Sequence, residues 1–136
     1  MKIKFYSLAN HSTQENQIDP IITQFEVEST YENFYNEEHD LEYETYIFKE
    51  PNNGVANCIE VNPERINIYA GPTTLSIAKD QGFDNSYVNV DGSKMILIAQ
   101  LLKVEKRENS NYFEYNLSTA NNQFIGNFKI EISHLD

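Results

Sequence analysis

Acidic side chains are the densest group in this chain that could perform chemistry. Residues 26–50 carry nine carboxylates and a single lysine, Lys49. Ca²⁺ and Mg²⁺ prefer carboxylate oxygens, but this stretch lacks the Asp-x-Asp-x-Asp-Gly loop that folds carboxylates around such a cation. We therefore predict no metal site and interpret the stretch as a solvated hairpin, with docking of a basic partner protein as the alternative function. The residues predicted for that docking surface are Glu37, Glu38, Glu42 and Glu44.

Tyrosines are the second group with functional potential. The chain has 9 Tyr and 8 Phe but no Trp. A tyrosine packs an apolar ring and keeps a polar hydroxyl, so it suits both a filled core and a ligand cavity. Tyr43 and Tyr115 alternate with charged residues along their strands, which makes them candidates for the interior of a barrel. We predict that these two side chains contact a small, largely apolar ligand; packing of the core is the alternative role.

Other reactive side chains form no catalytic constellation in the sequence. The three histidines, His11, His39 and His134, lie far apart without metal-ligand spacing, and we interpret them as surface residues. Cys58 has no basic neighbour that would activate its thiol. The chain also lacks the Gly-x-Ser-x-Gly elbow and the glycine-rich phosphate-binding loops. The sequence predicts neither an enzyme nor a cofactor.

Length and charge limit the remaining classes of function. A chain of 136 residues predicts one domain, 1–136. Its formal net charge of −11 disfavours nucleic acids and anionic membranes, because both attract positively charged proteins. The single cysteine cannot form an internal disulfide, and no apolar run approaches the ~18 residues of a membrane span. These features predict a cytoplasmic protein.

The clearest structural pattern is a hairpin at 111–132. Two runs of alternating apolar and polar residues flank a polar turn at 118–122, as in two strands that each bury one face. Gly126 within the second run indicates a bend or a close approach of another backbone. The same combination of strand and turn recurs about every 8–12 residues, which is typical of an antiparallel barrel or sandwich.

These runs predict an all-β fold, an antiparallel up-and-down closed β-barrel of about 8–10 strands. The polar residues 31–40 are interpreted as a turn or an extended strand tip, and 80–85 as a turn. The last strand is expected to pair with 2–8 or with 21–27, because closure removes exposed sheet edges. The strands are predicted at 2–8, 21–27, 41–50, 55–61, 65–70, 73–79, 86–90, 94–105, 112–117 and 123–133.

Several short motifs follow one another along these strands. They are YIFKE at 46–50, IEV at 59–61, INIYAG at 66–71, FEYNL at 113–117 and IGNFKI at 125–130. Their order resembles the YwiB-like family of small uncharacterised bacterial proteins, over residues 21 to the end. That family is placed among the calycin-like (lipocalin-like) β-barrels, so the resemblance implies a barrel and no activity. Family members tend to carry an arginine before the glycine that ends the fifth strand, whereas Ala70 precedes Gly71 here.

Overall fold

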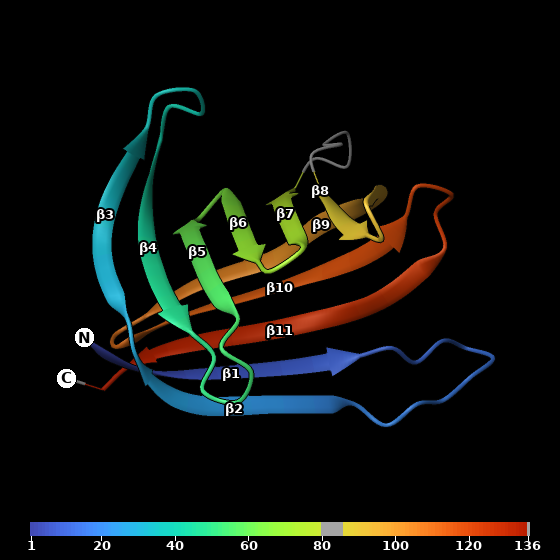
Figure 1. Cartoon of the computed structure of the whole chain (residues 1–136), viewed down its shortest axis with the longest axis horizontal. Coiled ribbons are helices and arrows are strands. Elements are labelled where there is room, and N and C mark those ends of the chain that lie inside the picture. Colours follow the sequence, from blue (N-terminus) through green and yellow to red (C-terminus); the bar gives the residue numbers. More distant parts are fainter. Residues whose placement is uncertain (80–85, 136) are drawn as a thin grey trace.

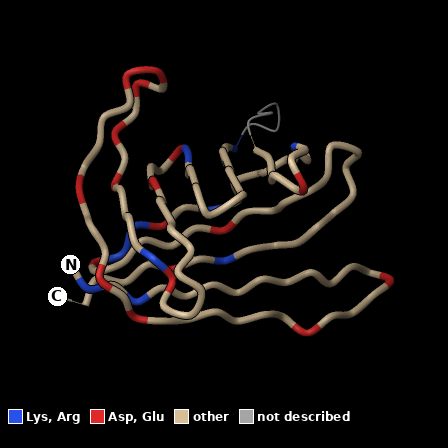
Figure 2. The backbone as a smooth tube through the Cα atoms, in the orientation of Figure 1, with Lys and Arg blue, Asp and Glu red and all other residues tan. Residues whose placement is uncertain are grey.

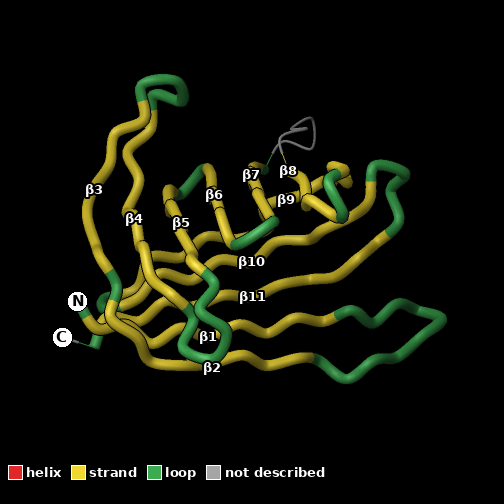
Figure 3. Tube along the Cα trace, viewed as in Figure 1, coloured by secondary structure: helices red, strands yellow, loops and turns green. Residues whose placement is uncertain are grey.

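All the regular secondary structure is β-strand in the computed structural model, which describes residues 1–79 and 86–135 (Figures 1 and 3). The all-β prediction is therefore confirmed. No helix within these ranges has the length and apolar character needed to cross a lipid bilayer. The turn predicted at 80–85 lies outside the described residues. The strands are β1 (Lys2–Asn10), β2 (Ile21–Glu28), β3 (Thr30–Asn36), β4 (Leu41–Lys49), β5 (Ala56–Asn62), β6 (Arg65–Ala70), β7 (Thr73–Ala78), β8 (Ser86–Val90), β9 (Ser93–Arg107), β10 (Ser110–Thr119) and β11 (Phe124–His134).

The strands form one 11-stranded sheet that curls into a nearly closed up-and-down barrel (Figure 1). From β3 to β11 each strand pairs with its neighbours in the sequence, and β1 and β2 extend the sheet beyond β11. The ladders are antiparallel, apart from one parallel contact between β7 and β9. The predicted pairing of the last strand with 2–8 is confirmed by the β1–β11 ladder. The strand count exceeds the predicted range because the polar stretch 31–40 contains most of β3.

Ser29 connects the two ends of the sheet. The two end strands, β2 and β3, are not paired with each other within the described residues, although only Ser29 separates them in the sequence. The backbone N–H of Ser29 donates to the carbonyl oxygen of Met1 at 2.8 Å, which continues the β1 side. The Ser29 hydroxyl lies within hydrogen-bonding distance of two carbonyl oxygens, that of Thr30 at 2.7 Å and that of Ile47 in β4 at 3.2 Å. The chain therefore changes from one wall of the barrel to the other at this buried serine.

Aromatic and aliphatic side chains fill most of the barrel. Phe113 and Ile132 are completely buried, and Tyr115 is 4% exposed. The Tyr115 ring stacks on Phe128 with 5.2 Å between the ring centroids. These residues alternate with solvent-facing neighbours along β10 and β11, so the predicted hairpin and its buried face are confirmed.

Gly126 allows the loop after β1 to approach β11 closely. A Cβ atom at this position would lie 2.8 Å from Nδ1 of His11, a distance that real Cβ atoms do not show. The same Nδ1 lies 2.9 Å from the carbonyl oxygen of Ile125. The backbone carbonyl oxygen of Asn10 would lie 3.2 Å from the same Cβ, so the predicted close approach of another backbone is confirmed. His11 is half-buried at this contact rather than a free surface residue.

Candidate functional site

The inward face of β4 changes from acidic to aromatic along the strand. Glu44, Tyr46 and Phe48 follow one another at every second position, so they share a face. Glu44 reaches Lys106 of β9, and Phe48 packs against Phe5 of β1 with 5.8 Å between ring centroids. These contacts cross the barrel, so this face points inward. The acidic part of the face lies at one end of the barrel, and the aromatic part belongs to the core.

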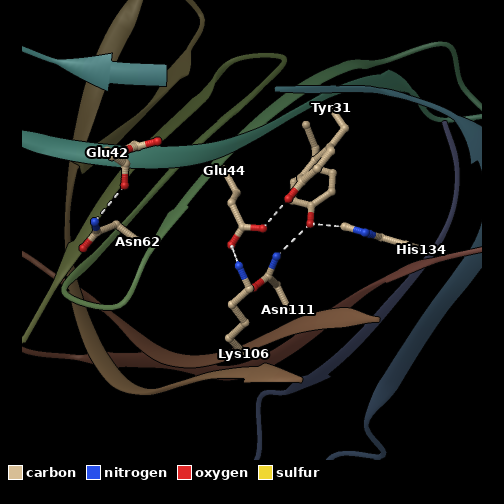
Figure 4. Close-up of polar contacts among 8 residues, drawn as sticks. Tyr31, Glu42, Glu44, Asn62, Lys106, Asn111 and His134 are labelled. Atoms are coloured by element: carbon tan, nitrogen blue, oxygen red, sulfur yellow. Dashed lines mark hydrogen bonds and ion pairs between the residues drawn. The ribbon is translucent and has the colours of Figure 1, made fainter. Parts of the chain in front are cut away.

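Glu44 is the centre of a polar network at that end (Figure 4). Its carboxylate accepts a hydrogen bond from the Tyr31 hydroxyl at 2.5 Å and pairs with the Lys106 ammonium at 3.2 Å. Burial acts to raise the pKa of Glu44, but the bonds from Tyr31 and Lys106 outweigh it and hold the pKa below its usual value. Burial and the Glu44 bond raise the pKa of Tyr31 to about 12. Glu44 is therefore ionised at neutral pH while Tyr31 keeps its proton.

Tyr46 connects this network to the end of β11. Its hydroxyl accepts a hydrogen bond from Nδ2 of Asn111 at 2.7 Å and lies 2.6 Å from Nε2 of His134. Since the hydroxyl oxygen accepts from Asn111, its own proton is available for Nε2 of a neutral His134 ring. Burial lowers the pKa of His134, which agrees with a neutral ring. The interpretation of His134 as a surface residue is wrong. Tyr46 and His134 are 88 residues apart in the sequence, so no local pattern indicates their contact.

A pocket of about 400 Å³ opens beside this network. Strands β3, β4 and β5 form one wall, and the ends of β9 and β10 form the other. Glu44 is the most enclosed charged group, with its side chain 15% exposed, whereas Lys106 is 69% exposed. The pocket thus combines fixed acceptors, one movable cation and an apolar patch. Its lining residues are Asn33, Glu42, Tyr43, Glu44, Val61, Pro63, Val104, Lys106 and Asn111.

Tyr43 is fully buried, but its side chain lies on the face of β4 opposite Glu44 and Tyr46. Its hydroxyl is 3.0 Å from Nδ1 of His39 in the β3–β4 turn, and burial raises its pKa. The prediction that this ring points into the barrel is therefore wrong, although Tyr43 contributes to the pocket wall. Alternation identifies the two faces of β4, but both faces carry large buried side chains, so the sequence could not show which one is internal.

A second polar cluster follows Tyr43 on this outer face. Asn67 of β6 is 2% exposed and donates to Oε1 of Glu60 at 3.1 Å. Arg65 donates to Oδ1 of Asn67 at 3.1 Å and to the hydroxyl of Ser76 at 2.5 Å. Each of these buried polar groups has a partner, as their burial requires. We therefore interpret the cluster as structural support that connects β5, β6 and β7.

The remaining predicted residues occupy three different places. Tyr115 lies in the core, stacked on Phe128, and is not a lining residue of the pocket. Glu42 and Glu44 line the pocket, while Glu37 and Glu38 are exposed in the turn between β3 and β4. Residues from β9 and β10 complete the pocket. Lys106 and Asn111 carry no local signal in the sequence, because only the folded barrel places them opposite β4.

Fold and pocket together define an antiparallel β-barrel with a polar pocket at one end. No family model and no curated protein matches the chain. Among solved structures, the chain is similar to the crystal structure of the YwiB protein from Bacillus subtilis, with a TM-score of 0.59. The match covers 99% of this chain and 91% of that chain at 11% identity. At this identity the likeness establishes a shared fold.

Replacement of Tyr46 by Phe tests whether the network supports the barrel. The variant leaves Nδ2 of Asn111 and Nε2 of His134 without their shared partner, so we expect a loss of about 1–3 kcal/mol in the free energy of unfolding. Chemical denaturation measures this value. Tyr69→Phe is the matched control, because Tyr69 is 44% exposed; it should change stability by less than about 0.5 kcal/mol. Equal effects of the two substitutions would contradict a supporting role for the network.

The neutral state of His134 predicts a dependence of stability on pH. Its pKa is lower in the folded protein than the usual value of about 6.5. Below about pH 6.5 the unfolded chain therefore binds a proton that the folded protein does not, and stability decreases as the pH falls. Above that pH neither state binds this proton, so His134 does not reduce the stability of the fold. Denaturation of the wild type and of His134→Gln between pH 7.5 and 5 should give a shallower decrease for the variant.

Burial also lowers the pKa of His39, so part of the slope should remain in His134→Gln. Parallel pH profiles for the wild type and the variant would show that His134 takes no part in the effect.

Proposed function

We propose that this protein is a YwiB-like, calycin-type barrel that binds a small molecule in the pocket at the end of the barrel. The single observation that carries the proposal is the pocket of about 400 Å³, which has a size typical of ligand sites. Convergent polar groups beside an apolar patch are the usual composition of such sites. We assign no catalytic activity and no cofactor, and we expect a cytoplasmic location.

The site differs from a ligand cavity at the centre of the barrel. Tyr115, Phe113 and Phe128 occupy the middle of the core, with stacked rings 5.2–6.2 Å apart. The proposed ligand therefore sits at the end of the barrel, with its apolar part against Val61 and Val104. Polar groups of the ligand face Glu44 and its neighbours, so a purely apolar ligand is a poorer match than one with a polar end.

Filling the pocket tests the proposal. Asn33 is exposed on the pocket wall, so Asn33→Trp should occupy the pocket without disturbing the core. We expect small molecules that bind the wild type in ligand-observed NMR screening to lose at least about tenfold in affinity for this variant. Phe34→Trp is the matched control, because Phe34 is the next residue and its side chain lies on the opposite face of β3. Unchanged binding to Asn33→Trp, or no binding to the wild type by any compound, would contradict the proposal.

A basic partner protein for the β3–β4 hairpin is the second candidate function. Its support is the group of acidic residues at the tip of this hairpin, shown in red in Figure 2. Glu37 and Glu38 are exposed there, whereas Glu44 is tied to Lys106 and faces the pocket. A partner would therefore contact the tip through Glu37 and Glu38, whereas Glu42 and Glu44 line the pocket.

Binding of a labelled lysine-rich peptide tests this second candidate. We expect affinity to fall as salt rises past about 0.1 M, where the screening length is about 10 Å. The double variant Glu37→Gln/Glu38→Gln should weaken binding more than Glu15→Gln/Glu108→Gln, which removes two exposed carboxylates elsewhere. Binding that is equal in the two variants, or that is independent of salt, would exclude a hairpin-specific interaction.

A further inference from the structure

The pocket presents more hydrogen-bond acceptors than donors to a ligand. The Glu42 carboxylate is exposed and makes no hydrogen bond or ion pair with the described part of the chain. Nδ2 of Asn62 donates to the backbone carbonyl of Glu42 at 2.8 Å (Figure 4). Asn111 is 2% exposed and uses Nδ2 on Tyr46. Its Oδ1 accepts no hydrogen bond from residues 1–79 or 86–135. A ligand that donates hydrogen bonds satisfies these groups.

Lys106 already shows what kind of group fits beside Glu44. Its ammonium occupies one oxygen of the carboxylate at 3.2 Å, while Tyr31 holds the other oxygen at 2.5 Å. Ion pairs that are open to solvent contribute little to stability. Because Lys106 is 69% exposed, its side chain can swing into solvent and leave its place to a ligand. Tyr31 would keep the Glu44 carboxylate in position during this exchange.

The surrounding charge favours cationic ligands over anionic ones. Lys106 is the one cation among the described lining residues, against Glu42 and Glu44. The neighbouring stretch 26–50 adds a strong acidic excess, and the whole chain carries a net charge of −11. Such a field raises the local concentration of cations and repels anions.

We propose that the pocket binds a primary ammonium group attached to a short apolar chain. The ammonium lies between Glu42, Glu44 and Oδ1 of Asn111, in the place of the Lys106 ammonium. The chain packs against Val61 and Val104. This inference rests on the proposed ligand-binding function and adds the chemical class of the ligand.

Three probes with the same carbon chain test the assignment: hexylamine, hexanol and hexanoate at neutral pH. Methyl NMR spectra of the full chain report binding through the signals of Val61 and Val104. Hydrogen bonds between charged groups are stronger than those of a neutral hydroxyl, so hexylamine should bind at least about tenfold more tightly than hexanol. Hexanoate should bind more weakly than hexanol.

Glu42→Gln tests direct contact with the ammonium. The Glu42 side chain has no bond to lose, so the variant should fold like the wild type and bind hexylamine about tenfold more weakly. Its affinity for hexanol should not change. Glu32→Gln is the matched control, because it removes the same charge from the same hairpin. The Glu32 side chain lies on the face of β3 that points away from the pocket. A smaller loss of hexylamine affinity in Glu32→Gln than in Glu42→Gln would show that Glu42 contacts the ammonium directly, beyond the general effect of negative charge.

The outcomes distinguish the two proposals. Equal binding of hexylamine and hexanol at Val61 and Val104 would overturn the ammonium assignment and leave the ligand site intact. An equal loss of hexylamine affinity in Glu32→Gln and Glu42→Gln would also overturn it. Failure of all three probes to shift either valine signal would count against the pocket as a ligand site.

Discussion

The contact between β4 and the opposite wall of the barrel is the interaction on which the rest of the structure depends. Strands β2 and β3 do not pair with each other in the described chain, so the sheet has no continuous ladder around its circumference. Ser29 connects the two walls through hydrogen bonds to Met1 and Ile47. Glu44 and Tyr46 add side-chain bonds to β9, β10 and β11. Closure at this end therefore depends on polar side chains in addition to the backbone bond of Ser29.

The same strand separates the core from the pocket. The inward face of β4 is aromatic at Tyr46 and Phe48, where it packs against the filled centre of the barrel. Two residues earlier, at Glu44, the face becomes acidic and water can enter. A half-buried carboxylate needs hydrogen-bonding partners, and Tyr31 and Lys106 provide them. The change from aromatic to acidic thus creates a half-enclosed polar site in a barrel that is otherwise packed.

Patterns of neighbouring residues in the sequence predicted those parts of the fold that depend on short-range structure. The hairpin at 111–132 and the close approach at Gly126 follow from alternation and from the absence of a Cβ atom. The alternation that identifies half-buried strands is absent from β3, because its aromatic residues Tyr31, Phe34 and Tyr35 are divided between the two faces. The pocket could not be predicted, since Lys106 lies 62 residues from Glu44 in the sequence. The internal face of β4 and the role of His134 likewise depend on strands far away in the chain.

The most direct test of the central claim, a ligand site beside Glu44, is measurement of intermolecular nuclear Overhauser effects between hexylamine and the protein. We predict contacts from the alkyl chain to the methyl groups of Val61 and Val104 at the end of the barrel. Contacts instead to Ile47 and Val55, which line a shallow groove on the outer face of β4 and β5, would contradict it.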